Sequence, residues 1–154
     1  MGKWGKCNFS QFKELKEKID NLQQKEFNNF CESVAKELAS RLLSKVIKRT
    51  PVGIYEGSTG KVGGTLRRGW TGGKTSNAQN YANSLPITKS GDMIQIEIIN
   101  PVEYASYVEY GHRTRNHKGW VKGQFMLTIS ENELQTQSPK IIEAKLLKYL
   151  GGIL

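Results

Sequence analysis

The sequence lacks the long apolar runs that mark membrane and secreted proteins. No run approaches the roughly 18 to 20 residues of a membrane-spanning helix, and no apolar segment follows the basic start, residues 1–7, as in a signal peptide. Cysteine is also scarce. Cys7 and Cys31 have no metal-ligand spacing, so we expect reduced cytosolic thiols, with a disulfide between them as the alternative.

The chain is poor in apolar residues for its length. Hydrophobic residues make up 37% of its 154 residues, and the mean hydropathy of -0.53 is low for a compact enzyme. This composition predicts one domain, residues 1–154, with an elongated or self-associating shape. Within it we expect an N-terminal helical arm over 1–26, a core over 27–135 and a C-terminal helix over 136–154.

Acidic residues are missing from two stretches of this basic chain. The formal net charge is +9, from 23 Lys and Arg against 14 Asp and Glu. The acid-free stretches, Gly57–Lys74 and Gly111–Gly123, could face nucleic acid or an acidic protein surface, or could be solvated loops that keep the protein soluble. Their cations are Lys61, Arg67, Arg68, Lys74, Arg113, Arg115, Lys118 and Lys122.

Catalytic and cofactor motifs are lacking as well. The stretch from Gly57 to Lys61 resembles a phosphate-binding loop, but Tyr55 and Val62 stand where such a loop needs Gly and Ser or Thr. No serine or cysteine has the context of a nucleophile elbow. We therefore expect no enzymatic activity and no cofactor.

One cluster could be drawn as a metal or nuclease site. His112 and His117 lie near Glu103 and Glu109 in the sequence. A zinc site needs ligands at fixed spacing on ordered elements, whereas these histidines flank a basic loop that contains glycine. We therefore expect no metal site.

The N-terminal third reads as helix from Ser10 to Lys48. Ser10 or Asn8 can cap its start, and apolar residues recur at three- and four-residue spacing. The pattern weakens at Gln23–Glu26, and an unbroken helix would be about 58 Å long. We therefore predict a short first helix, a joint near residues 23–27 and a second helix that ends before Pro51.

Glycine is concentrated in one segment, which predicts a mobile loop that orders against a partner. Eight of the 16 glycines fall between Gly53 and Gly73. A strand is then expected to begin at Leu66–Trp70, and a weaker strand over Tyr81–Thr88. After a turn at Ser90–Asp92, the alternation in Met93–Asn100 predicts the clearest strand, with Ile94, Ile96 and Ile98 on one face.

Helices are predicted again in the C-terminal third. Pro101 opens a short helix that ends at Gly111. A loop over 112–122 leads to a helix over about 124–133, and Ser138-Pro139 opens a last helix. The expected fold class is α+β: a long N-terminal helix packed on a small antiparallel sheet, a short helix after the last strand, and C-terminal helices.

Aromatic residues in this region have two interpretations. Helical spacing places Tyr104 and Tyr107 on one face, which favours packing of the short helix onto the sheet. With Tyr110 and the arginines that follow, they could instead form a stacking-plus-cation surface for nucleic acid. For Trp70 and Trp120, beside glycine-containing loops, we expect anchoring in the core or at an interface.

Four segments, in this order, resemble a family of small phage tail-component proteins, the tail-completion or neck proteins. They cover roughly residues 30–135. The Tyr-Ala-x-x-Val-Glu-x-Gly block is the most specific of them. Between the first two segments this chain inserts Gly53–Gly63, where the family usually passes almost directly. The segments are Thr50-Pro51-Val52, the Gly-x-Leu-Arg-x-x-Trp block Gly64–Trp70, the block Asn100–Gly111, and Gly123–Met126.

This resemblance implies a structural part at the top of a phage tail or tail-like particle, assembled in the bacterial host cytoplasm. Six copies in a ring would match tail symmetry and would join tail terminator, tube or sheath to head-closure or connector proteins, with no membrane partner. A heterologous interface repeated around an axis closes into such a ring. The alternative is a DNA-binding module that uses both basic loops; DNA in the channel of a ring could also be contacted in passing.

Eight residues are candidates for contacts with neighbouring subunits. The arginines are expected to make polar contacts and the tryptophans to act as anchors. We also expect Glu109 to pair with Arg67 or Arg68 and so brace the bases of the loops. The candidates are Arg67, Arg68, Trp70, Glu109, His112, Arg113, Arg115 and Trp120.

Overall fold

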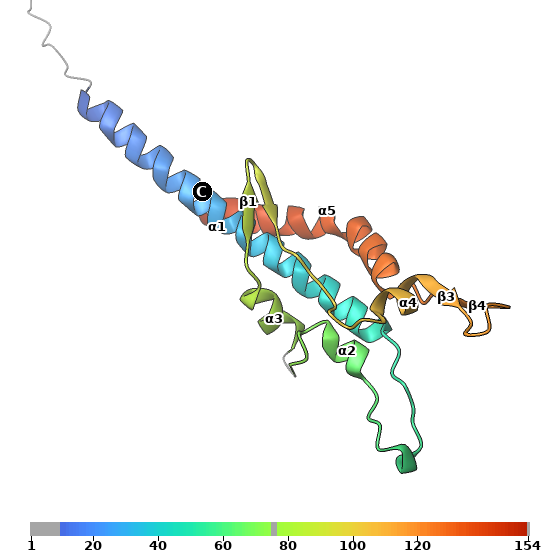
Figure 1. The fold of residues 1–154 in the computed structure, drawn as a ribbon. Coiled ribbons are helices and arrows are strands. Elements are labelled where there is room, and N and C mark those ends of the chain that lie inside the picture. The colour runs from blue at the N-terminus through green and yellow to red at the C-terminus, as the bar shows by residue number, and fades with distance from the viewer. Residues whose placement is uncertain (1–9, 75–76, 154) are drawn as a thin grey trace, which may run out of the picture.

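The computed structural model describes residues 10–74 and 77–153, and its longest element is one unbroken helix, α1, Ser10–Arg49 (Figure 1). The predicted joint near residues 23–27 is wrong. Gln, Lys and Glu in Gln23–Glu26 are good helix formers. The interruption of the apolar pattern therefore leaves these side chains exposed, but the backbone stays helical. Cys7 and Asn8 lie outside the described residues, and Cys31 is partly buried on α1.

The second half of α1 carries the core. Here α2 (Thr65–Gly69), α3 (Ala78–Ser84) and the N-terminal end of α5 (Met126–Ile153) meet. The first half of α1 extends past them, as Figure 1 shows. The buried apolar side chains of the main cluster are Ala39, Leu43, Val46, Leu66, Trp70, Ala82 and Met126.

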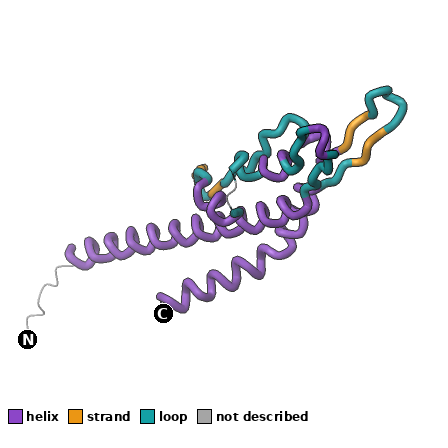
Figure 2. The backbone as a smooth tube through the Cα atoms, turned by 90° about the horizontal axis from the view of Figure 1, so that it is seen from below, coloured by secondary structure: helices purple, strands orange, loops and turns teal. Residues whose placement is uncertain are grey.

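Helix α5 runs antiparallel to α1 and returns along it (Figure 2). Salt bridges join Glu133 to Lys45 and Arg49 near one end and Lys145 to Glu37 further along. The Phe30 and Tyr149 rings stack with centroids 4.6 Å apart toward the other end. These contacts fix the register of α1 and α5. The two helices together form the main framework of the molecule.

The two helices predicted for residues 124–153 form this one helix, with Pro139 inside it. Proline lacks the N–H that would bond the carbonyl of Gln135, four residues earlier. Ser138 Oγ donates to that carbonyl at 3.1 Å instead. Proline in a helix interior causes a bend, and α5 does change direction along its length (Figure 2).

The β-structure consists of two separate hairpins rather than one sheet. Strands β1 (Thr88–Ser90) and β2 (Met93–Gln95) pair across the turn predicted at Ser90–Asp92. The alternation predicted beyond Met93 is confirmed, since Ile94, Ile96 and Ile98 are partly buried and the residues between them are exposed. The ladder nevertheless ends at Gln95, and the extended chain after it packs on the core. The α+β fold class is confirmed.

Two predicted strands are helical instead. Leu66–Trp70 lies in and just after α2, and Tyr81 lies in α3, so only Thr88 of the weaker predicted strand is in a β-strand. Leu66 and Trp70 are four residues apart, a spacing that places both on one helical face as well as on one side of a strand. Their burial on α1 selects the helix.

The last elements before α5 are a short helix and a projecting hairpin. Helix α4, Ala105–Tyr110, begins four residues after Pro101 and ends at Gly111, as predicted for its C-terminus. The predicted loop 112–122 contains β3 (Gly111–Arg113) and β4 (Trp120–Lys122), which form the second hairpin. This hairpin extends away from the helices (Figure 2).

Candidate assembly interface

The four segments that carry the family resemblance meet in the fold. Trp70 is 4% exposed, and its indole N–H donates to Thr50 Oγ1 at 2.8 Å. Thr50 in turn donates to the Val46 carbonyl at 2.6 Å. This chain of bonds closes the C-terminus of α1 over the core, so Trp70 anchors the interior of its own chain.

Asn100 joins the second segment to the third. Its side-chain amide donates to the Leu66 carbonyl at 2.8 Å, and its oxygen accepts from Val102 N–H at 3.2 Å. A Cβ atom at Gly69 would overlap that oxygen. Glycine is therefore needed at 69 for the close approach of α2 to Asn100.

Glu109 joins the third segment to the fourth. The side chain is 5% exposed and accepts from the Leu127 and Thr128 N–H groups, each at 2.9 Å, and from Thr128 Oγ1 at 2.7 Å. A carboxylate here satisfies free donors at the start of α5 and lies at the positive end of its dipole.

The predicted pair between Glu109 and an arginine is not formed. Arg67 donates to the Thr50 carbonyl at 3.2 and 2.8 Å, and Arg68 donates to the Gly63 carbonyl at 3.2 Å. Both arginines therefore hold the two ends of the inserted loop, which agrees with the bracing role expected of them but uses backbone carbonyls as partners.

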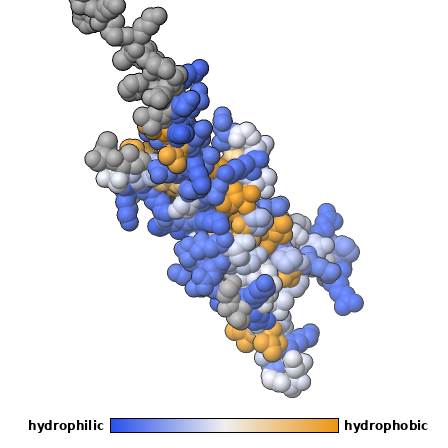
Figure 3. Space-filling view, turned by 90° about the vertical axis from the view of Figure 1, so that its left-hand side faces the viewer, coloured by the Kyte–Doolittle hydropathy of each residue, from blue (hydrophilic) through white to orange (hydrophobic). Residues whose placement is uncertain are grey.

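The loop over residues 51–64 contains the insertion Gly53–Gly63 and carries the two most exposed large apolar side chains among the described residues. Ile54 is 97% exposed and Val62 is 76% exposed. The loop extends from the ends of α1 and α2 with the single turn η1 (Gly57–Thr59) at its tip (Figure 1). Apolar atoms lie at the surface at that end of the molecule in Figure 3. We call this segment the projecting loop.

A second apolar surface lies on the part of α1 that extends past the core. Every described side chain from Lys13 to Phe27 is exposed, including those of Ile19 and Leu22. Helical periodicity places Ile19 on the face that carries Phe30, which packs on α5 further along. The exposed stripe is thus continuous with a face that is used for packing. We call residues 13–27 the arm.

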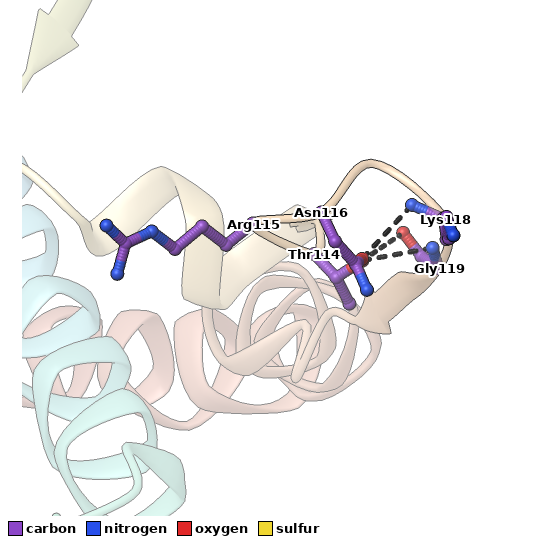
Figure 4. Close-up of a pocket in the computed structure, with 5 residues that line it drawn as sticks. All are labelled: Thr114, Arg115, Asn116, Lys118 and Gly119. Atoms are coloured by element: carbon purple, nitrogen blue, oxygen red, sulfur yellow. Dashed lines mark hydrogen bonds between the residues drawn. The ribbon is translucent and has the colours of Figure 1, made fainter.

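The β3–β4 hairpin is basic and has an ordered tip. Thr114 Oγ1 bonds with Asn116 Oδ1 at 2.6 Å and with the Gly119 N–H at 3.0 Å, and the Lys118 N–H donates to Asn116 at 3.2 Å. Figure 4 shows Arg115 pointing away from this cluster. The cationic side chains of the hairpin therefore extend into solvent from a tip closed by its own hydrogen bonds.

The tyrosines of α4 do not pack the helix onto a sheet, contrary to the favoured prediction. Tyr104, Tyr107 and Tyr110 are all exposed. The buried residue of α4 is Glu109, because the start of α5 needs an acceptor there. Tyr107 instead contacts the edge of the His112 ring, with centroids 5.8 Å apart.

The structure thus separates the eight candidate contact residues. Trp70 and Glu109 are interior, and Arg67 and His112 are partly buried. The other four, Arg68, Arg113, Arg115 and Trp120, are exposed. The apolar side chains of the projecting loop were not among the candidates, although Ile54 and Val62 stand isolated among glycines in the sequence.

The described part of the chain contains neither a metal-binding cluster nor a membrane-spanning helix. No group of three His, Cys, Asp or Glu side chains in residues 10–74 and 77–153 could hold an ion. No described helix is long and apolar enough to cross a membrane.

Comparison with protein families gives one match. The family model for bacteriophage HK97 gp10-like tail components matches residues 13–111, more than half of the chain. Comparisons with curated proteins and with solved structures gave no match. The matched range contains the bonds from Thr50 to Trp70 and from Asn100 to Leu66, and it ends at Gly111. The chain therefore belongs to the HK97 gp10-like family of phage tail components, which are structural proteins rather than enzymes.

Proposed function

We propose that this tail component forms a hexameric ring at the top of the tail and joins the tail to head-closure or terminator proteins. The observation that carries the proposal is the projecting loop, whose Ile54 side chain is 97% exposed. Exposed apolar side chains of this kind mark protein interaction sites. A loop that contacts a different surface on the next copy makes a heterologous contact, which generates a ring where the rotation between copies closes.

An apolar pocket beside α4 is the surface that we assign to the neighbour's loop. Its volume is about 230 Å³, and Ala105, Ser106 and Tyr110 line its α4 side. A separate hollow of about 270 Å³ lies at the base of the projecting loop. Tyr104, just before α4, and Val108, within α4, line this second hollow. Loop and pocket are therefore distinct surfaces, as a heterologous contact requires.

Four exposed candidates complete the proposed contacts. Arg68 lies at the base of the projecting loop, and Trp120 lies on the hairpin and is 62% exposed. Tryptophan and arginine are enriched among residues that dominate interface energetics. We assign Arg68 to the contact between copies. We assign the hairpin, with Arg113, Arg115 and Trp120, to contacts other than the one between copies.

The test is the mass of the assembled particle. Light scattering of the purified protein should give about 104 kDa, six chains of 17.3 kDa. Ile54→Glu should shift it toward the monomer, and so should Ser106→Trp, which fills the receiving pocket. Glu56→Gln in the same loop is the matched control. A wild-type monomer at high concentration, or normal assembly of Ile54→Glu, would refute the ring contact.

A second candidate function, contact with DNA, is favoured by the charge of the hairpin. It does not compete with assembly, since a ring component can carry both surfaces.

A further inference from the structure

The register of the β3–β4 hairpin places cations and a tryptophan on one face. Arg113 pairs with Trp120, His112 with Val121, and Gly111 with Lys122. In an antiparallel pair, directly opposite residues share a face, and the face changes at each step along a strand. Arg113, Trp120 and Lys122 therefore lie together, and His112 and Val121 occupy the other face. We call the first the cationic face.

The charge of this hairpin is not compensated locally. No Asp or Glu occurs between Tyr110 and Ser130. The five salt bridges among the described residues include none of the hairpin cations. The nearest carboxylate in sequence, Glu109, is buried and bonded to the start of α5. Exposed cations without acidic neighbours produce a positive potential that attracts polyanions.

The hairpin is also shaped before any partner arrives. Bonds from Thr114 to Asn116 and Gly119 hold the tip, which leads into the ladder of β3 and β4. A preordered element loses less conformational entropy on binding than a flexible loop. The cations Arg115 and Lys118 line the surface of this tip (Figure 4).

We propose that the cationic face binds DNA through the phosphodiester backbone. Arg113 and Lys122 contact phosphates on either side of Trp120, and the tip cations add two further contacts. A two-stranded β-ribbon is of a width that the major groove of B-DNA admits. Where bases are unpaired, the exposed indole can stack on them.

An acidic protein surface fits the hairpin less well. Protein interfaces have an apolar, desolvated centre with a polar rim. The hollow at the hairpin tip is lined by Thr114, Arg115, Asn116, Lys118 and Gly119. The two large apolar side chains that the hairpin exposes, Trp120 and Val121, lie on opposite faces of the ladder and form no joint apolar patch. The projecting loop has the opposite character, with exposed Ile54 and Val62. The projecting loop and the hairpin thus differ in character: the first exposes apolar side chains and the second exposes cations.

The experiment is fluorescence anisotropy with a short labelled duplex and the matching single strand, over a salt series from about 50 to 200 mM. Four phosphate contacts predict a slope of about -3.6 for log affinity against log salt on the duplex. Arg113→Gln with Lys122→Gln should reduce the slope magnitude by about 2. Lys140→Gln with Lys148→Gln removes the same charge from exposed positions of α5 and should leave the slope unchanged.

Trp120 supplies an independent readout. It is 62% exposed, whereas Trp70 is 4% exposed. In a Trp4→Phe background these are the two remaining tryptophans, so quenching of their emission by DNA that is lost on Trp120→Phe reports contact at the cationic face. Strong quenching by the single strand alone would identify base stacking, and duplex binding without it would identify groove docking. Either result supports the proposal.

Three results would overturn it: no binding of either DNA at the lowest salt, equal losses in the hairpin and α5 variants, or competition by polyglutamate as effective as by unlabelled DNA. The last would assign the face to an acidic protein. Because each chain carries its own hairpin, DNA binding is measurable whether or not the ring assembles. Failure of this proposal and failure of the ring are therefore distinguishable, and circular dichroism confirms that each variant is folded.

Discussion

Glu109 links α4 to the start of α5 through three accepted hydrogen bonds. Glu109→Ala leaves two buried N–H groups without an acceptor, so the free energy of unfolding should fall by about 3 kcal/mol. Urea unfolding followed by circular dichroism measures this. Glu103→Ala removes an exposed carboxylate from the same segment and should change stability by less than about 0.5 kcal/mol. Equal effects of the two changes would show that the cap does not stabilise α5.

Gly69 is a second residue whose side chain, or lack of one, decides packing. In Gly69→Ala the new methyl group overlaps Asn100 Oδ1, which should cost about 1 to 3 kcal/mol of folding stability. Gly57→Ala is the matched control, because a Cβ atom there meets nothing within 4 Å. The same urea titration compares them. If Gly69→Ala is as stable as Gly57→Ala, the close approach of α2 to Asn100 is not required.

At the scale of elements, the ion pairs between α1 and α5 predict loss of stability in acid. The hydrogen bond from the Lys145 ammonium and, to a smaller extent, the one from the Arg41 guanidinium lower the pKa of Glu37 below 4.5. The hydrogen bonds from the Lys45 ammonium and, to a smaller extent, from the Arg49 guanidinium likewise lower the pKa of Glu133 below 4.5. A carboxylate with a lowered folded pKa contributes stability that is present above its unfolded pKa and lost as the pH falls through the folded value.

The melting temperature should therefore fall as the pH drops below about 4.5, and it should fall less steeply in Glu37→Gln with Glu133→Gln. Because these side chains are accessible to solvent, the difference should shrink at high salt. Glu143→Gln, an exposed change on α5 outside the described ion pairs, serves as the control. Identical acid profiles for the double variant and the wild type would contradict the role of these pairs.

Periodicity in the sequence was enough to predict that both ends of the chain are helical and which face of the 93–98 segment is buried, but not that α1 and α5 are each unbroken. The prediction of helix or strand was wrong where one spacing of apolar residues fits both structures. Leu66 and Trp70 suit either a strand or a helix, and only packing on α1 decides between them. Pro139 marked a predicted helix start, but Ser138 satisfies the carbonyl that it frees, so the helix continues. Such compensation depends on contacts that local propensity does not encode.

The candidate site was predicted less well than the fold. The core position of Trp70 is one of the two that the sequence suggested, whereas the buried position of Glu109 at the start of α5 was not predicted. In a sequence, a buried carboxylate cannot be distinguished from an exposed one. The role of Glu109 as an acceptor becomes clear only when the Leu127 and Thr128 N–H groups are seen to donate to it. The signature blocks contribute to the core and its hydrogen bonds, whereas the segment between the first two blocks is exposed.

At the scale of the whole molecule, the arm and the projecting loop extend from a small core in different directions (Figure 1). This elongated form explains the low apolar content, since much of the chain is not buried within one copy. Under the proposed function, we expect a second copy or another tail protein to cover these surfaces during assembly. The arm then supplies a prediction that is separate from the loop.

Ile19→Glu with Leu22→Glu should weaken assembly by placing charge on the apolar stripe of the arm, while the melting temperature stays within a few degrees of wild type because these side chains are exposed. Asn21→Glu with Gln24→Glu adds the same charge to exposed positions away from the stripe. Sedimentation velocity of the two variants gives the comparison. Equal assembly in both would exclude the stripe as an interface.

The most direct measurement of the assembly role is complementation of a gene deletion in the genome that encodes this chain, followed by negative-stain imaging of the particles. Deletion should yield full heads beside unjoined tails, or tails with unfinished tops. Wild-type protein should restore joined particles, Glu56→Gln should do the same, and Ile54→Glu should not. Complete, normal particles in the deletion strain would contradict a role in completing the tail.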